Sequence, residues 1–316
     1  MSTLKKISEV ANCSLSTVSK ALNNCNDISE KTREKILTIA KDMGYFQKKK
    51  KIKLENRKKN KFNIAILCPE IESNYYSKMI IDISYELSKY NSDTVIYNYS
   101  FDNNRLHELL DTCHNADDVD AIICLSKIVD YVLFDDMPVI TFGENTYTTT
   151  FFYDVSAGLR AVFESLGKND LIYIVSEDKT TSQEKEFSKI SKDFTSITAK
   201  KFLSINRFEQ AGYEAGEYFI NNGILPNAVI CAYDEIALGL IEYLSNQGIK
   251  IPEQVSVIGI NDIPTAKYCF GGLTTISFDF KSIASVMIKD LIDDLKKQKK
   301  RICHYNVPSR LIKRNT

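Results

Sequence analysis

The sequence predicts an α/β protein built from a small helical head and a larger body of parallel sheets covered by helices on both faces. Three observations support this fold class. Helical periodicity fills the first 46 residues, a lysine-rich run follows, and from Phe62 onward apolar runs alternate with helical patterns. No stretch of 18 or more apolar residues is present, so no membrane partner is expected.

The compartment is predicted from the N-terminus and the cysteines. The opening MSTLKKISEV lacks the apolar core of a signal peptide. The eight cysteines form no CxxC pair, and Cys68, Cys124 and Cys231 lie inside apolar runs. We therefore expect free buried thiols, a reducing compartment and a cytoplasmic protein.

Charge is distributed unevenly between head and body. Residues 1–61 carry 16 Lys and Arg against 6 Asp and Glu, a net charge of +10. Residues 62–316 carry 25 against 35, a net charge of −10. This asymmetry predicts that the head alone meets nucleic acid.

Three short helices are predicted in the head. The first spans residues 4–11, the second runs from Leu15 to about Leu22, and the third begins after the N-cap Ser29 and ends at Gly44. Asn12 suits the turn between the first two, because asparagine tolerates a positive φ better than most residues. Two helices joined by a three-residue turn and braced by a third form a helix-turn-helix.

The second helix has two distinct faces. Helical pitch places Val18, Ala21 and Leu22 in one apolar stripe, with Ser16 and Lys20 pointing away from it. Small hydrogen-bonding groups and one cation suit close approach to a polyanion, although a serine-rich helix without a special role is the alternative. In a helix-turn-helix this helix enters the major groove, where Ser16 and Lys20 would face base edges.

The head resembles a known DNA-binding unit. The stretch TLKKISEVANCSLSTVSKALNNCNDISEKTREKILTIAKDMGY, Thr3 to Tyr45, is similar to the headpiece of the lactose/galactose-repressor (LacI/GalR) family, with STVSKALN, SEKTREKI and the final GY at the family's spacing. The resemblance implies base-reading positions at Leu15, Ser16 and Lys20. It implies phosphate contacts, which fix register, at Thr17, Ser19, Asn23, Ser29, Thr32 and Tyr45.

Residues 48–61, KKKKIKLENRKKNK, are predicted to be a basic linker with eight Lys and one Arg. In the family the corresponding segment becomes a hinge helix on DNA, and a leucine wedges into the minor groove. Leu54 has the matching spacing from Tyr45. The family's Pro-Asn and Ala-Arg are replaced here by Gln47-Lys48 and Lys51-Ile52, so the wedge is an expectation beside a purely electrostatic linker.

The body predicts parallel sheets. Seven apolar runs indicate strands: NIAILC, TVIYNY, AIICL, PVITF, LIYIV, AVICA and VSVIGI. Helices are predicted near 75–89, 103–116, 156–167, 209–222, 235–247 and 280–298. The sequence contains no GxGxxG, P-loop, GxSxG or HExxH motif, and its three histidines lack metal spacing. A small-molecule binding module is therefore favoured over an enzyme, and neither metal nor cofactor is expected.

The resemblance continues through PNAVICAYDEIALGLIEYLSNQGIKIPEQVSVIGINDIPTAKYCFGGLTTISFDF and the ending VPSRLIKRNT. It implies a periplasmic-binding-protein-like fold of two lobes joined by three crossing strands, with the ligand in the cleft. The expected domains are a head (1–47), a linker (48–61) and an effector-binding and dimerisation domain (62–316). Within that domain, lobe 1 is expected at about 62–168 and 279–306, and lobe 2 at about 169–278 and 307–316.

The family's effector positions correspond to Tyr75, Tyr76, Asp154, Gln183, Arg207, Tyr233, Asn261 and Phe280. Some of these residues have structural alternatives. Tyr75 and Tyr76 would also pack a helix start, and Asp154 would cap the helix that begins near Ser156. Asp234 and Asp262, which are not in the set, are expected to be structural, at a helix start and a strand end.

Several effector positions depart from the family. Sugar-binding members usually carry Arg at Gln183, Asn at Tyr233, Asp at Asn261 and an aromatic ring at Arg207. These replacements make an ordinary hexose a less expected effector. A cation at Arg207 calls for an acidic or phosphate group on the effector, or for pairing with Asp154. Alternatively, Arg207 lies on the rim, or a one-residue shift places Phe208 there.

The combined prediction is an effector-responsive transcriptional regulator, most often a repressor in this family. It would bind a palindromic double-stranded DNA operator as a homodimer and respond to a sugar or sugar derivative. Two alternatives remain at the level of sequence. One is an effector-independent DNA-binding protein with a decayed cleft, and the other is an α/β enzyme with a basic tail.

Overall fold

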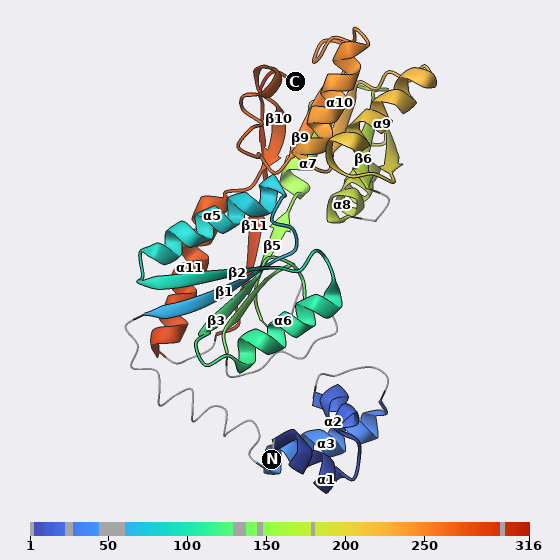
Figure 1. The fold of residues 1–316 in the computed structure, drawn as a ribbon. Coiled ribbons are helices and arrows are strands. Elements are labelled where there is room, and N and C mark those ends of the chain that lie inside the picture. The colour runs from blue at the N-terminus through green and yellow to red at the C-terminus, as the bar shows by residue number, and fades with distance from the viewer. Residues whose placement is uncertain are drawn as a thin grey trace. The chain divides into compact units, whose positions relative to one another are not determined.

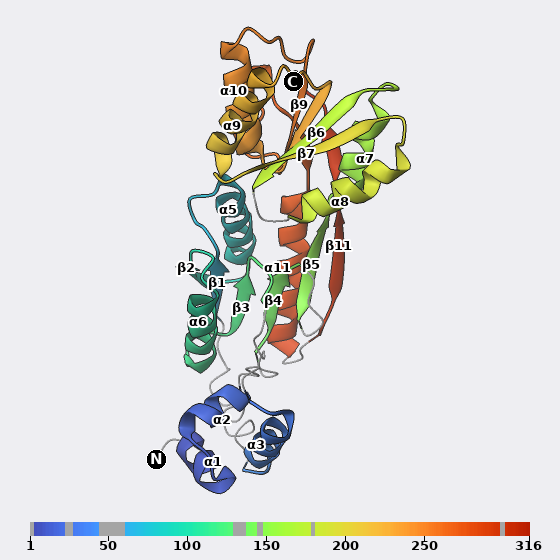
Figure 2. The ribbon, with the colours of Figure 1, turned by 90° about the vertical axis from the view of Figure 1, so that its right-hand side faces the viewer.

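The computed structural model describes residues 3–22, 28–43, 61–128, 137–143, 148–177, 181–297 and 301–316 (Figures 1 and 2). The chain forms two compact units. Unit 1 comprises Met1–Phe151 and Ala284–Tyr305, and unit 2 comprises Phe152–Ile283 and Asn306–Thr316. The chain passes between them within three elements: β5 (Thr149–Asp154), α11 (Phe280–Lys297) and β11 (His304–Pro308).

The boundary expected near residue 168 is wrong, because the chain leaves unit 1 at Phe151. The reason is the packing of α7 (Ser156–Glu164) on the sheet of unit 2. Gly158 lies so close to the Ile276 side chain that a Cβ there would overlap it. The Gly158 amide also donates to Ser309 Oγ at 2.9 Å. A helix expected in lobe 1 therefore belongs to unit 2.

The head forms a three-helix bundle of α1 (Thr3–Ala11), α2 (Leu15–Leu22) and α3 (Glu30–Asp42). Each helix contributes two residues to a common buried core: Ile7, Ala11, Val18, Ala21, Ile36 and Ala40. Alternation of these residues at three- and four-residue spacing is what the sequence pattern predicted. Gly44, the expected end of the third helix, lies outside the described residues.

The turn between α1 and α2 confirms the prediction for Asn12, which adopts a φ of 53°. Cys13 N donates to the Ser8 carbonyl at 3.1 Å and Asn12 N to the Glu9 carbonyl at 3.3 Å, which is the Schellman pattern of helix ends. Lys35 Nζ on α3 donates to the Ala11 carbonyl at 3.0 Å. These bonds fix the angle at which α2 leaves α1.

Unit 1 contains a six-stranded sheet in the order β11-β5-β4-β3-β1-β2. Its other strands are β1 (Phe62–Cys68), β2 (Ser92–Asn98), β3 (Ala121–Cys124) and β4 (Val139–Phe142), and β1 to β5 run parallel. The helices are α5 (Asn74–Ser88), α6 (Asn103–Asn115) and most of α11. Leu106, Leu109 and Leu110 of α6 share a buried core with β1 and β3.

Unit 2 contains a second six-stranded sheet in the order β12-β10-β9-β8-β6-β7. The strands are β6 (Leu171–Glu177), β7 (Thr198–Ser204), β8 (Ala228–Cys231), β9 (Ser256–Ile260), β10 (Thr274–Ser277) and β12 (Arg310–Ile312). Among the described residues of this sheet, β12 runs antiparallel to its neighbour β10, and the other adjacent strands run parallel. The remaining helices are α8 (Ser182–Ile190), α9 (Phe208–Asn221) and α10 (Asp234–Asn246).

Helices α9 and α10 pack against each other through glycines. A Cβ at Gly212 would overlap the Ile236 carbonyl, and one at Gly239 would overlap the Glu209 carbonyl. The two backbones are therefore in contact near the start of α9. This contact sets the spacing of the residues that precede the two helices.

The predicted state of the cysteines holds within the described residues. Cys68, Cys124 and Cys231 are buried and form no disulfide. Burial raises the pKa of both Cys68 and Cys124 to about 11, so these groups remain neutral thiols near neutrality. Among the helices that the structure describes, none is long and apolar enough to cross a membrane.

Candidate nucleic-acid interface and effector site

The exposed face of α2 carries two of the three predicted base-reading residues. Ser16 and Lys20 are exposed, whereas Val18 and Ala21 are buried, as helical pitch predicted. Leu15 and Ser19 belong to α2, but their side chains lie outside the described part of the structure. The other predicted contacts outside the described residues are Asn23, Tyr45 and Leu54.

Hydroxyl groups cap the starts of α2 and α3. Ser14 Oγ accepts from Thr17 N at 3.0 Å and lies 2.7 Å from Ser16 Oγ. Ser29 Oγ accepts from Thr32 N at 3.2 Å and lies 2.7 Å from Thr32 Oγ1. The two serines thus satisfy backbone N–H groups at helix N-termini, where anions are also favoured. The capping role of Ser14 was not predicted, although its spacing to Thr17 matches that of Ser29 to Thr32.

Four candidate effector residues lie at or just beyond the carboxyl ends of parallel strands in unit 2. Glu177 ends β6, Arg207 follows β7 and precedes α9, Tyr233 follows β8 and precedes α10, and Asn261 follows β9. Because these strands are parallel, their carboxyl ends share one edge of the sheet, the usual ligand-binding edge in α/β proteins. Three of the four are predicted positions, and Glu177 was not predicted.

Arg207 forms an ion pair at this edge. Its Nε donates to Glu177 Oε1 at 3.0 Å, and its guanidinium lies 4.5 Å from the centroid of the Phe208 ring. The Phe208 ring in turn lies 6.5 Å from that of Tyr233. The sequence left open whether Arg207 or Phe208 lies at the candidate effector site. In the structure both side chains lie there, in contact with each other. The counter-charge is Glu177 in place of the expected Asp154.

Asp154 caps a helix instead. Its Oδ1 accepts from Ser156 N at 2.9 Å and also from the Ser156 hydroxyl. Asn306 Nδ2 donates to the other oxygen at 3.4 Å. The Ser156 hydroxyl and amide lower the pKa of Asp154 below its usual value. The capping alternative for this residue is therefore confirmed, and the expected pairing with Arg207 is wrong.

The other predicted effector residues make contacts within their own units. In unit 1, Tyr75 packs on Tyr76 at 4.9 Å between ring centroids, at the start of α5. Phe280 is buried at the start of α11, 5.6 Å from the Tyr153 ring. Gln183 Oε1 accepts from the Ser182 hydroxyl at 3.0 Å in the first turn of α8.

Asp234 is fully buried beneath the sheet edge. Its two oxygens accept from Ile263 N at 2.7 Å and from Thr275 Oγ1 at 2.5 Å, and burial raises its pKa to about 8. Asp262 accepts from Arg314 Nη2 at 2.6 Å. These bonds tie the loop after β9 to α10 and to the C-terminal segment, so the structural roles expected for both aspartates are confirmed.

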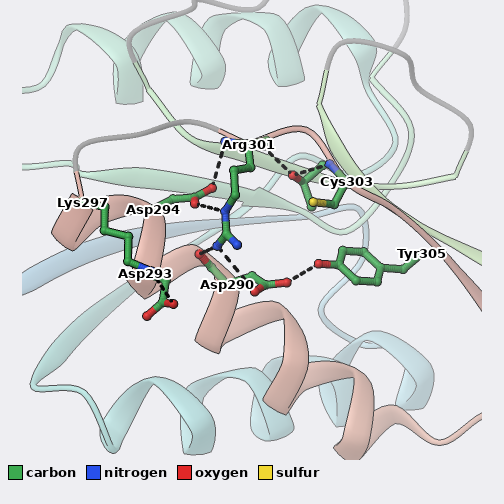
Figure 3. Close-up of polar contacts among 8 residues, drawn as sticks. Asp290, Asp293, Asp294, Lys297, Arg301, Cys303 and Tyr305 are labelled. Atoms are coloured by element: carbon green, nitrogen blue, oxygen red, sulfur yellow. Dashed lines mark hydrogen bonds and ion pairs between the residues drawn. The ribbon is translucent and has the colours of Figure 1, made fainter.

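A second polar network lies in unit 1 (Figure 3). Arg301 Nε donates to Asp294 Oδ1 at 2.5 Å, and its Nη2 donates to the Asp290 carbonyl at 3.1 Å. The Tyr305 hydroxyl donates to the Asp290 carboxylate. Figure 3 shows Arg301 directed at α11 from the segment that follows it. These bonds therefore hold the start of β11, and Arg301 just before it, against α11.

Family comparisons match both parts of the chain. Residues 3–47 match the family described as bacterial regulatory proteins, lacI family. Residues 161–316 match the periplasmic binding protein-like domain. The HTH-type transcriptional regulator GalR of Streptococcus thermophilus is 28% identical over 305 residues, covering 88% of each chain.

Solved structures show the same fold. The lac repressor dimer bound to operator and the anti-inducer ONPF has a TM-score of 0.71 and 19% identity, covering 100% of this chain and 98% of that one. The transcriptional regulator CelR–cellobiose complex has a TM-score of 0.69 and 17% identity, covering 100% and 99%. The predicted fold class is confirmed. The two family matches and the similarity to GalR show that the chain joins a lacI-family DNA-binding head to a periplasmic binding protein-like domain, as transcriptional regulators similar to LacI and GalR do.

Proposed function

We propose that this regulator is a repressor that binds a palindromic operator as a homodimer and responds to a small-molecule effector, a sugar or sugar derivative. The observation that carries the proposal is the exposed Ser16–Lys20 face of α2, held on a packed three-helix core. A rigid helix with a polar outer face and hydroxyl-capped N-terminus suits insertion into a major groove.

Exposed apolar side chains on unit 1 support a dimer of this chain. Ile81 and Tyr85 are exposed on α5, with Ile81 at 66%, and Val95 and Ile96 are exposed on the adjacent edge strand β2. Apolar residues gathered on an edge strand and its neighbouring helix favour burial against a second copy. Two-fold pairing would present two headpieces to the two halves of a palindrome.

Operator binding is the central test. Selection from random duplexes is expected to yield a palindromic site that binds two chains, with affinity falling on the order of 10³-fold between 50 and 200 mM salt as several phosphates are neutralised. Lys20→Ala is expected to reduce discrimination between selected and random DNA by about tenfold, because it removes a base-edge contact. Thr32→Ala is expected to weaken all duplexes alike. Fluorescence anisotropy measures each affinity.

Lys6→Ala is the matched control, since it removes an exposed lysine from α1 and leaves the outer face of α2 intact. Its discrimination ratio is expected to equal that of the wild type. Equal affinity for selected and random DNA in the wild-type protein, or an affinity independent of salt, would contradict the proposal.

The linker gives a separate prediction about DNA shape. If Leu54 wedges open a base step, Leu54→Ala is expected to lower operator affinity by about tenfold and reduce the bend angle. Dimerisation and thermal stability should not change. Circular-permutation gel shifts measure the bend. Wild-type bending by the variant would show that the lysine run acts as an electrostatic tether only.

A further inference from the structure

We infer that Glu177 and Arg207 act together as the specificity-determining pair of the effector site, and that they select an uncharged polyhydroxylated ligand over a sugar phosphate or a sugar acid. The inference rests on the proposed effector role of unit 2 and adds a ligand class and a residue to it. It also reverses the expectation of an acidic effector that Arg207 alone suggested.

The geometry of the pair is the first argument. Glu177 and Arg207 lie 30 residues apart in sequence and meet where β6 ends and α9 begins. Glu177 is 14% exposed at its side chain and Arg207 is 40% exposed, so the carboxylate lies deeper and the guanidinium lies nearer solvent. A partly buried ion pair holds both groups in fixed orientations, which a ligand-reading site requires.

Charge compensation is the second argument. An anionic ligand gains most from a cation that has no carboxylate beside it, and Arg207 already has Glu177 at 3.0 Å. Arg314, a second guanidinium of unit 2, is likewise bound to Asp262 at 2.6 Å. The positive charge that Arg207 offers to an incoming phosphate or carboxylate is therefore already offset by Glu177.

The aromatic side chains supply the third argument. Phe208 stacks under the Arg207 guanidinium at 4.5 Å, and the Tyr233 ring lies 6.5 Å from that of Phe208. A sugar ring presents hydroxyl groups at its rim and C–H groups on its faces. The carboxylate accepts from hydroxyls, the guanidinium donates to their oxygens, and the rings cover the C–H faces. An uncharged polyol satisfies each group without burying an extra charge.

The test compares neutral and charged members of the same sugars. The full-length protein is titrated with three matched pairs by calorimetry and thermal shift: ribose and ribose 5-phosphate, glucose and glucuronic acid, cellobiose and cellobionic acid. At least one neutral compound is expected to raise the Tm and to bind about tenfold or more tightly than its charged partner. Glu177→Gln is expected to weaken binding of the neutral compound about tenfold. It should also reduce the ratio between the affinities for the neutral compound and for its charged partner.

Two further variants separate recognition from folding. Arg207→Lys keeps the charge but loses the planar guanidinium, so it should also weaken the neutral compound about tenfold. Asp193→Asn removes the carboxylate of an exposed ion pair with Arg160, 2.7 Å long, and should bind ligand as the wild type does. Circular dichroism and operator affinity show whether each variant is folded.

Equal or tighter binding of a charged member overturns the inference, as does wild-type affinity in Glu177→Gln and Arg207→Lys. It is also overturned if none of the six compounds stabilises the protein. Each of these outcomes leaves operator binding intact. Loss of sequence-specific DNA binding in the wild-type protein would instead contradict the proposed regulator function, so the two failures are distinguishable.

Discussion

Gly239→Ala is expected to lower the free energy of unfolding of unit 2 by about 3 kcal/mol, because the added methyl group would overlap the Glu209 carbonyl. The overlapping atoms belong to the backbone of α9, so a change of side-chain rotamer cannot relieve the overlap. Separation of α9 from α10 would also displace Arg207 and Tyr233, which directly precede these helices. Urea denaturation should therefore show a lower midpoint, and ligand affinity should fall with it.

Gly167→Ala is the matched control in the same unit. A Cβ at Gly167 would meet the Asp170 carboxylate at 3.5 Å, an ordinary contact distance. Its unfolding midpoint is expected to stay close to that of the wild type. If Gly239→Ala and Gly167→Ala unfold at the same urea concentration, the backbone contact between α9 and α10 does not limit stability.

The second large effect concerns pH. Burial raises the pKa of Asp234 from 3.8 to about 8, so the folded state holds a proton that the unfolded state releases above pH 4. Because the folded state binds more protons, stability is expected to fall as pH rises from about 4 to 8, with no further change above that window from this group. Asp234→Asn cannot ionise, and its stability relative to the wild type should therefore rise from pH 5 to about pH 8 and level off above that.

Unfolding midpoints across this range measure the effect. Asp293→Asn is the control, because the hydrogen bond from Lys297 lowers the pKa of exposed Asp293, which places its titration below the window. This variant should follow the wild-type pH profile. Parallel profiles for the wild type and Asp234→Asn would show that Asp234 is already ionised in the folded protein at pH 5.

Six of the seven strands found from sequence are largely buried on both faces, and the exception is the edge strand β2, on which Val95 and Ile96 are exposed. A parallel strand covered on both sides reads as a continuous apolar run, as AVIC and SVIGI do in β8 and β9. The helices of the head were predicted equally well, because their buried apolar residues repeat at helical spacing. The sequence pattern is therefore clearest in the helices and strands whose apolar residues are most completely buried.

Elements with weaker patterns were missed. β7, TAKKFLS, is an edge strand with two lysines, and β10, TTIS, has four residues and three hydroxyls. β5, β11 and β12 were also not predicted. The helix α8 buries only Phe187 and Ile190 among its apolar residues, too few for a clear period. Short or half-exposed elements take their conformation from tertiary neighbours, which a local pattern does not contain.

The proposed effector site, at the carboxyl ends of the parallel strands of unit 2, was predicted only in part. Arg207 and Tyr233 were identified through the family resemblance, but Glu177 was not, because its contact is with a residue 30 positions away. A glutamate at the end of the apolar run LIYIVS was the available signal. The expected pairing of Asp154 with Arg207 was wrong, because Asp154 is bonded to Ser156 and Arg207 to Glu177.

Each unit is built from two segments that are far apart in sequence, and this has a consequence for folding during synthesis on the ribosome. β5 pairs with a strand made long after it: Thr149 Oγ1 donates to the Arg301 carbonyl, 152 residues later. At cellular elongation rates that interval takes roughly 8–30 s. Throughout it, the outer edge of β5 lacks its permanent neighbour and can pair with a strand of another nascent chain. Slower initiation on the messenger RNA, which spaces ribosomes apart, should therefore raise the soluble yield more than slower elongation does.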